Sequence, residues 1–225
     1  MNHFITTLLF ITVLFSSNAL HAQIPYDPDI LTTRHQQVTE LNWVLQNDHD
    51  GVIVYNREVK DSGIREVLAF TEIKLPAVVL FKTISDYAHY KDFMPYVQKS
   101  EVLPSIHDQK IRVYQKLVFP WPISNRYYTI ELTPDTTQAH LGHYAVSWTL
   151  SNEEMAEEKG VQLQINDGYW RFCAAADNLT FVEYYIHTDP GGLLPQWAVN
   201  QANTQAVIEV IQALQKRATL DASSR

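Results

Sequence analysis

The chain has 225 residues, of which 46% are hydrophobic, 12% aromatic and 19% charged, and its formal net charge is −8. This composition is typical of a globular protein and excludes a disordered one. The acidic balance, with no Lys- or Arg-rich run, argues against nucleic acid or an anionic membrane surface as partner, because both need a basic footprint. The single cysteine, Cys173, excludes an intrachain disulfide and a thiolate metal cluster.

Residues 1–22 have the pattern of an export signal peptide. An apolar stretch runs from Phe4 to Phe15 and is too short to span a membrane, which takes about 20 such residues. Small residues follow, and cleavage after Ala22 would leave Gln23 at the mature end. The alternative interpretation is a buried N-terminal helix. With a signal peptide, residues 23–225 are predicted to form a single domain in the periplasm or outside the cell.

The first half of the mature chain is predicted to contain two helices around a hairpin. The spacing of apolar residues favours a helix from about Pro28 to Leu45, ended by the turn residues 47–51. A β-hairpin is predicted next, with strands at 52–59 and 65–73 and a turn at 61–63. A second helical region begins at Pro76, since proline is tolerated in a first turn, and runs toward Pro95.

The second half is predicted to be mostly strands, closed by one long helix. Strands are expected near 97–103, 111–119, 127–133, 141–150, 169–175 and 179–187, with an exposed acidic loop at 151–160. The helix runs from Pro195 to Ala218, with an apolar row at every fourth residue (Ala198, Ala202, Ala206, Val210 and Leu214) that Val207 and Ile211 widen. This order predicts an α+β fold in which a curved antiparallel sheet holds the closing helix, with a space between them.

No catalytic motif stands out. The sequence has no Gly-x-Ser-x-Gly elbow, no local nucleophile signature, no GxGxxG and no Walker loop. Asp86, His89 and Asp92 could place three metal ligands on one side of a helix, although an exposed charged face explains them equally well. The paired glutamates at 153–154 and 157–158 are interpreted as solvated rather than as acid–base groups. No cofactor and no metal are therefore expected.

Aromatic residues gather on the predicted strands instead. Tyr144, Val146 and Trp148 share one face of their strand. One interpretation is a well-packed core. The other is an apolar cavity with a few polar tips, since Tyr and Trp combine an apolar body with one hydrogen-bonding end. Arg126 shares a face with Tyr128, and if buried it needs a partner or a ligand head group; the alternative is an exposed Arg126.

Five blocks of residues, in this order, resemble the START domain (steroidogenic acute regulatory protein-related lipid transfer) family. They are Trp43 with 50–59 (DGVIVYNREV), 84–90 (ISDYAHY), 93–95 (FMP), 120–126 (PWPISNR) and 188–197 (TDPGGLLPQW). The resemblance implies a helix-grip fold, in which a curved antiparallel sheet wraps around a long C-terminal helix. It also implies an internal tunnel for one lipid, sterol or other hydrophobic molecule, with that helix and neighbouring loops as its lid.

Two places depart from the family pattern. Arg126 is followed by Tyr127 where relatives commonly have Asp, so a local ion pair is lost. The positions at which sterol carriers of the family place an acidic residue and an arginine fall at Lys99 and Leu132, so that arrangement for a sterol hydroxyl is not reproduced. The resemblance therefore carries over the fold but not the identity of the ligand.

The residues expected to bind a ligand lie on the strands, at Arg126, Tyr128, Tyr144, Val146, Trp148, Trp170 and Tyr184, and on the closing helix, at Val207 and Ile211. The expected function is non-catalytic binding or transport of a lipid, sterol-like or other hydrophobic small molecule, since each CH₂ left in water costs about 0.8 kcal/mol. Gly191–Gly192 is predicted to be a hinge for release or a plain turn. Transient membrane contact is compatible with this function.

Two alternative functions remain open at this point. One is a polyketide cyclase or aromatase-like enzyme of the same helix-grip superfamily, with the arginine and tyrosines steering a reactive chain. The other is an interaction module whose interior is filled. The sequence leaves the oligomeric state undetermined.

Overall fold

The computed structural model describes residues 30–49, 51–104, 110–121, 123–151, 160–176 and 178–223. The elements are α1 (Ile30–Glu40), β1 (Val44–His49), β2 (Val52–Arg57), β3 (Glu66–Ile73), α2 (Ala77–Ile84), the 3-10 helix η2 (Tyr87–Asp92), β4 (Val97–Leu103), β5 (Ile111–Leu117), β6 (Arg126–Asp135), the 3-10 helix η3 (Ala139–Leu141), β7 (His143–Leu150), β8 (Val161–Gln162), β9 (Ile165–Ala176), β10 (Leu179–Asp189) and α3 (Gln196–Ser223). The predicted signal peptide at 1–22 and the acidic residues 152–159 lie outside the described residues.

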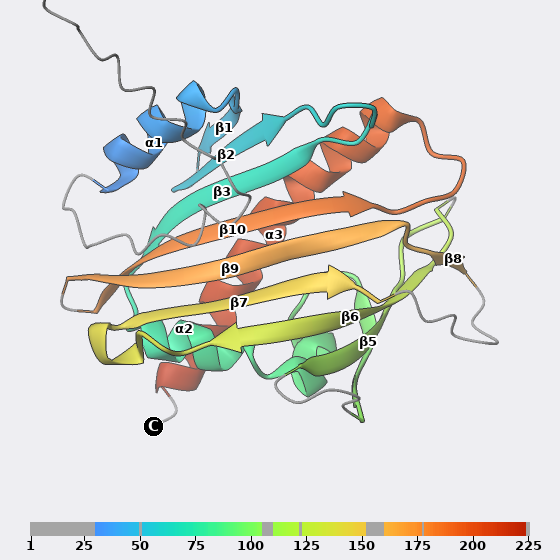
Figure 1. Ribbon diagram of the computed structural model, residues 1–225. Helices are drawn as coiled ribbons and strands as arrows, with labels where there is room; N and C mark the ends of the chain where they lie inside the picture. The colour runs from blue at the N-terminus through green and yellow to red at the C-terminus, as the bar shows by residue number, and fades with distance from the viewer. Residues whose placement is uncertain are drawn as a thin grey trace, which may run out of the picture.

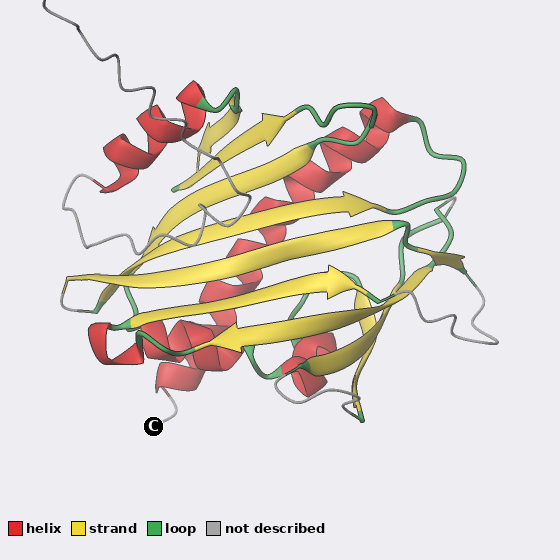
Figure 2. Ribbon diagram, viewed as in Figure 1, coloured by secondary structure: helices red, strands yellow, loops and turns green. Residues whose placement is uncertain are grey.

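The strands form one sheet around which the helices are arranged (Figure 1). Their order is β1-β2-β3-β10-β9-β7-β6-β5-β4, and every neighbouring pair on this path is antiparallel. The short strand β8 pairs with β6 in parallel. Figure 2 shows α3 crossing behind the strands, with α2 beside its far end and α1 on the opposite side of the sheet. This arrangement confirms the predicted α+β fold, a curved antiparallel sheet around a long C-terminal helix.

The sheet buries side chains on both faces. We call the face under α2 and α3 the inner face, and the face under α1 the outer face. Successive residues of a strand alternate between them, so that Val67 and Ala69 of β3 point inward and Leu68 and Phe70 outward. The inner core also includes Leu80 and Ile84 of α2, Val113, Ile130, Leu132, Phe172 and Val182 of the sheet, and Ile211 and Leu214 of α3. The smaller outer core comprises Val38, Trp43, Tyr55, Leu68, Phe70 and Phe181.

The prediction of a helix that reaches Leu45 is wrong. α1 ends at Glu40, and a turn in which Asn42 has a φ of 64° leads into β1. Val44 and Leu45 are 60% and 45% exposed. β1 is an edge strand whose pairing with β2 shifts register between Leu45 and Asn47, so it lacks the regular alternation by which a strand is recognised.

Both later helices form, with bounds that differ from those predicted. The region after Pro76 divides into α2 and η2 instead of forming one helix. On α3 the buried stripe is Val207, Ile211, Leu214 and Ala218, whereas Ala202 is exposed. A row spaced by four drifts around a helix of 3.6 residues per turn by about 40° at each step. Within the described ranges, no helix has both the length and the apolar character needed to cross a bilayer.

Candidate functional site

Four of the predicted site residues come together in one layer on the inner face. The register places Val146 of β7 opposite Trp170 of β9, and Trp170 opposite Tyr184 of β10. The rings of Trp170 and Tyr184 stack with their centroids 4.0 Å apart, and the Trp148 ring lies 6.0 Å from that of Tyr184. All four side chains are buried. We call these four residues the inner aromatic layer.

The other apolar site residues lie around the inner aromatic layer. Val207 and Ile211 of α3 are buried in the same inner core as the layer. Tyr144, at the start of β7, is half-buried and stacks on Phe81 of α2, with ring centroids 5.0 Å apart. The predicted residues therefore face both helices that cover the inner face, and not α3 alone.

A glycine makes room for one of the aromatic rings. Trp148 of β7 lies opposite Gly168 of β9, and a Cβ at residue 168 would collide with the indole. The indole N–H of Trp148 donates a hydrogen bond to Oδ1 of Asn166, at 3.3 Å. Asn166 and Gly168 share a face of β9 because they are two residues apart. The ring is thus held flat against the strand with its single polar atom satisfied.

A chain of hydrogen bonds leaves the inner core from Tyr128. Its hydroxyl donates to Oε1 of Gln115, whose Nε2 donates to Oγ of Ser100 at 3.2 Å. The Ser100 hydroxyl donates to the backbone oxygen of Tyr87 at 2.6 Å. The sequence analysis missed Gln115, although the signal was present, because Gln115 is a polar residue two positions after inward-facing Val113 on β5 and shares its face.

Three phenols meet in the inner core. Burial raises the pKa of Tyr90 well above its ordinary value, and the nearby phenols of Tyr87, Tyr184 and Tyr128 raise it further. Burial likewise raises the pKa of Tyr184 and that of Tyr128, the latter opposed by a hydrogen bond with Asn166. Tyr90, Tyr128 and Tyr184 therefore stay protonated at physiological pH. The Tyr128 hydroxyl donates to Gln115 and the Tyr90 hydroxyl to the backbone oxygen of Ile84, so these groups bring polarity but no charge into the inner core.

Arg126 is buried at the start of β6, with 3% of its surface exposed, so the alternative of an exposed arginine is wrong. Its Nε donates to the carbonyl of Pro190 at 3.2 Å and its Nη2 to that of Gly191 at 3.3 Å. Its Nη1 donates to the carbonyl of Ser124. Burial lowers the pKa of the guanidinium. In this structure the partner that a buried arginine requires is the chain's own loop between β10 and α3.

That loop turns at two glycines. Gly191 and Gly192 have φ angles of 66° and 80°, in the left-handed region that favours glycine. The amide of Gly191 also donates to Oδ1 of Asp189 at 2.8 Å. These angles account for both glycines as a turn, and their use as a hinge stays a prediction.

The two positions of the sterol-type pair bring no charge into the inner core. Leu132 is buried there among apolar neighbours. The Lys99 ammonium lies over the ring of Tyr114, 5.1 Å from its centroid, and pairs with Oε2 of Glu101 at 3.1 Å. Lys99 and Leu132 therefore do not supply the pair that sterol carriers of the family place at these positions.

Carboxylates are scarce around the inner aromatic layer. Glu183 is the only fully buried carboxylate among the described residues, and it lies on the outer face between inward-pointing Val182 and Tyr184. Asp86 and His89 form an exposed pair, with Oδ1 and Nδ1 2.7 Å apart. In the part of the chain that the structure describes, no three His, Cys, Asp or Glu side chains come together as metal ligands. Around the inner aromatic layer the inner face is therefore apolar and aromatic, with neutral hydroxyls, and Arg126 is the buried charge at the start of β6.

Comparisons of the sequence place it among known proteins. The family model described as polyketide cyclase / dehydrase and lipid transport matches residues 73–215. An uncharacterised protein of Pseudomonas aeruginosa is 25% identical over 179 residues, which cover 79% of this chain and 87% of that protein. Mouse phosphatidylcholine transfer protein is 22% identical over 178 residues, which cover 76% of this chain and 80% of that protein.

Solved structures with the same fold include proteins of two functional kinds. A STAR-related lipid transfer protein fragment from Xanthomonas axonopodis matches with a TM-score of 0.70 and 28% identity, over 79% of this chain and 98% of that chain. An aromatase/cyclase from a Streptomyces species matches with a TM-score of 0.51 and 15% identity, over 69% of this chain and 94% of that chain. The TM-score, the sequence identity and the coverage are all higher for the lipid transfer protein fragment than for the aromatase/cyclase.

Proposed function

Because the chain belongs to the polyketide cyclase/dehydrase and lipid transport family, we propose that it binds one lipid or other hydrophobic small molecule, without catalysis, between the sheet and α3. The observation that carries this proposal is the inner aromatic layer, whose polar atoms are uncharged. Such a surface suits an apolar ligand with few hydrogen-bonding groups. The likeness to the STAR-related lipid transfer protein of Xanthomonas axonopodis supports the same function.

The energetics of opening favour α3 as the moving part. The described inner core joins α3 to the sheet through apolar side chains such as Val207, Ile211 and Leu214. Separating these surfaces exposes apolar area at about 25 cal/mol per Å², and a bound lipid covers that area again while burying its own. The ligand thus replaces contacts between α3 and the sheet. Its polar end would meet the hydroxyls of Tyr128 and Tyr184.

The loop between β10 and α3 is the gate in this proposal. It leads directly into the N-terminal end of α3, and Arg126 fixes its backbone to the start of β6. Release of those two carbonyls would free the loop and the end of α3 together. Gly191 and Gly192 would then absorb the change in backbone direction.

The second candidate is a cyclase or aromatase-like enzyme, which the family's description also covers. Arg126 and the inner tyrosines would steer a reactive chain. Such chemistry uses a positioned proton donor and acceptor. The inner phenols hold their protons, and the buried carboxylate Glu183 lies on the other face of the sheet. These features favour the carrier over the enzyme.

We also propose that residues 1–22 direct export, so that the carrier works in the periplasm or outside the cell. Fractionation of expressing cells, with N-terminal sequencing of each fraction, tests this. A protein that begins at Gln23 in the exported fraction supports it. A protein that keeps Met1 and stays in the cytoplasm contradicts it.

Native mass spectrometry, with organic extraction of whatever co-purifies, tests the carrier function. We expect an added mass that is lost on denaturation and is identified as a lipid. Bare protein that also takes up no lipid from a whole-envelope extract would contradict the carrier function. Turnover of an aromatic polyketide precursor that is lost in Arg126→Ala would favour the enzyme instead.

A reversible disulfide tests whether α3 is the element that moves during lipid exchange. The Gln196 amide occupies the place that a side chain at residue 63 would take, so a Gly63→Cys/Gln196→Cys double variant can form a disulfide there. In the oxidised state the N-terminal end of α3 is tied to the β2–β3 turn, and we expect lipid exchange to slow. The same protein reduced with dithiothreitol is the matched control. Equal exchange rates in both states would show that α3 does not open at this end.

A further inference from the structure

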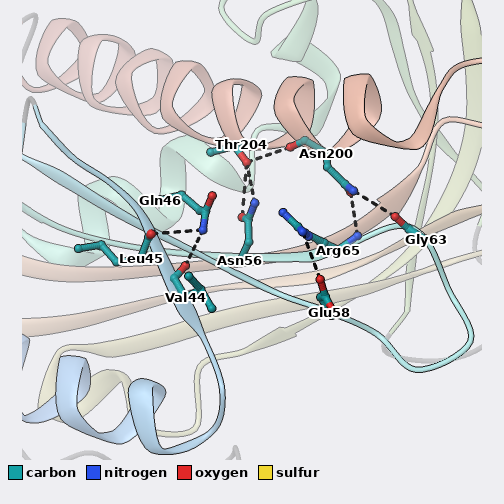
Figure 3. A network of polar contacts seen from close by, with 9 residues as sticks. All are labelled: Val44, Leu45, Gln46, Asn56, Glu58, Gly63, Arg65, Asn200 and Thr204. Carbon is teal, nitrogen blue, oxygen red and sulfur yellow. Dashed lines mark hydrogen bonds and ion pairs between the residues drawn. The ribbon is translucent and has the colours of Figure 1, made fainter.

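A hollow lies at the edge of the sheet, outside the inner core. It is a cleft of about 750 Å³ between the N-terminal half of α3, strands β1 and β2, and the β2–β3 turn (Figure 3). The chain has 26 asparagines and glutamines, and seven of them line this cleft. Its two charged side chains, Glu58 and Arg65, pair with each other, with Oε1 and Nη2 3.2 Å apart. The cleft is therefore polar and electrically neutral.

Hydrogen bonds hold the walls of the cleft in place. Asn200 of α3 donates through Nδ2 to the carbonyl of Gly63 at 3.0 Å, and its Oδ1 accepts from the amide of Arg65 at 2.9 Å. Asn56 of β2 donates through Nδ2 to Oγ1 of Thr204 at 3.0 Å. Figure 3 shows these bonds joining α3 to β2 and to the β2–β3 turn. A site whose walls are already fixed loses little conformational entropy when it binds.

Other amides of the cleft keep groups available for a ligand. Gln201 makes no side-chain hydrogen bond within the described part of the chain. Gln46 donates through Nε2 to the carbonyls of Val44 and Leu45, which leaves its Oε1 as an acceptor. An amide places donors beside an acceptor. A hydroxyl group, which donates and accepts at once, matches that arrangement.

An exposed aromatic ring completes the lining. Trp197, in the first turn of α3, lines the cleft and is 71% exposed. Its indole has an electron-rich face, on which the slightly positive C–H groups of a saturated ring pack well. A sugar presents such C–H groups on the faces of its ring and hydroxyls around the edge. Trp197 and the amides would therefore meet different parts of one sugar.

We propose that this cleft binds a neutral polyhydroxyl group, the chemistry of a sugar, as a free saccharide or as the head group of a glycolipid. A charged ligand would find no unpaired countercharge among the lining residues, since Glu58 and Arg65 neutralise each other. A hydrocarbon chain would cover the amides without satisfying them, which is costly. The volume lies within the range of small-molecule sites, about 300–1,000 Å³. This site lies outside the inner core proposed for the lipid, and α3 forms a wall of both.

Titration of the ¹⁵N-labelled protein with maltotriose and with chitotriose tests the site, read by the indole N–H resonances. We expect the indole N–H resonance of Trp197 to shift saturably. The resonance of Trp121, which is exposed outside the cleft, should not shift. Trp197→Ala and Gln201→Ala each weaken binding by about tenfold, the loss of one good contact. Trp121→Ala and Gln212→Ala are the same changes outside the cleft and leave binding unaltered.

Phosphatidylcholine vesicles with and without a glucosyl lipid distinguish the two sources of the sugar. Binding of the soluble saccharides assigns a free saccharide, and binding only to the glucosyl vesicles assigns a lipid head group. Either result supports the site. The absence of saturable binding to all these probes overturns it, and so does binding that survives both Trp197→Ala and Gln201→Ala. Because lipid extraction reads the inner core and this titration reads the cleft, the two proposals fail separately.

Discussion

The two faces of the sheet hold their helices by different means. On the outer face, Nη2 of Arg34 in α1 lies 2.5 Å from Oε2 of the fully buried Glu183. Oε1 of the same carboxylate accepts from the Tyr169 hydroxyl at 2.6 Å and from Nη1 of Arg171 at 3.3 Å. On the inner face, α3 meets the aromatic layer through apolar side chains such as Val207. The outer face is held by a buried ion pair, and the inner face by apolar contacts together with the hydrogen bonds of Arg126 to backbone carbonyls.

This difference indicates which face can open. Lifting α1 would separate Arg34 from Glu183 and leave a charge without its partner in a poorly polar surrounding, which is strongly unfavourable. Lifting α3 exposes apolar surface and releases the hydrogen bonds that Arg126 makes to backbone carbonyls of the loop before it. An apolar ligand restores the lost burial. We therefore interpret α1 as a permanent cover and α3 as the movable one.

The largest effect is expected for Glu183→Gln, which breaks the outer network. Arg34 and Arg171 lose the carboxylate that compensates them, and removing one partner of a buried pair costs about 3–5 kcal/mol of unfolding free energy. Urea denaturation measures the loss. The control is Glu58→Gln, since Glu58 pairs with Arg65 but its side chain is 83% exposed, and such pairs contribute about 0–1 kcal/mol. If both variants lose equally little, charge does not hold the outer face.

The inner face was the more predictable of the two from sequence. Its strand residues alternate regularly, as Tyr144, Val146 and Trp148 do, and α3 is long and free of breakers, so both the fold and the aromatic layer could be inferred. The pairing of Arg34 with Glu183 on the outer face could not be inferred, because the two residues are 149 positions apart and follow no shared pattern. The contact of Arg126 with the carbonyls of Pro190 and Gly191 could not be inferred either, because residue types alone do not show which backbone groups a buried guanidinium meets.

The edge of the sheet was the least predictable region. β1 pairs on one side only, and the exposed Val44 and Leu45 give it no inward-facing pattern. The cleft beside β1 was also missed. Its amides come from Gln46 through to Gln205, and polar residues scattered over that length look like ordinary surface until the fold brings them together.

A smaller effect is expected from two matched tyrosine variants, one on each face. Tyr128→Phe leaves the neutral Oε1 of Gln115 without its donor, whereas Tyr169→Phe removes a donor from the charged Glu183. Neutral hydrogen bonds contribute about 0.5–1.5 kcal/mol and bonds to charged groups about 1.5–3 kcal/mol. Urea denaturation of both variants should therefore show the greater loss for Tyr169→Phe. A greater loss for Tyr128→Phe would reverse the comparison between the faces.

The smallest perturbation is a change of pH, read at Cys173 on the outer face. Burial raises the pKa of this thiol from 9.0 to about 11, Glu183 adds to the rise, and Arg171 and Arg34 oppose it. The thiolate is the reactive form, so alkylation of the native protein by iodoacetamide should be slow at pH 8 and accelerate up to about pH 11. The urea-unfolded protein, with an ordinary thiol, is the control and should react faster at pH 8.

The same shift has a consequence for folding. The unfolded chain loses this proton near pH 9 and the folded chain near pH 11. The free energy of unfolding is therefore unaffected by this thiol below pH 9 and decreases as the pH rises from 9 toward 11. Native and unfolded protein that are alkylated at the same rate at pH 8 would mean that the outer face opens readily. In that case α1 could not be the permanent cover, and the assignment of movement to α3 alone would fail with it.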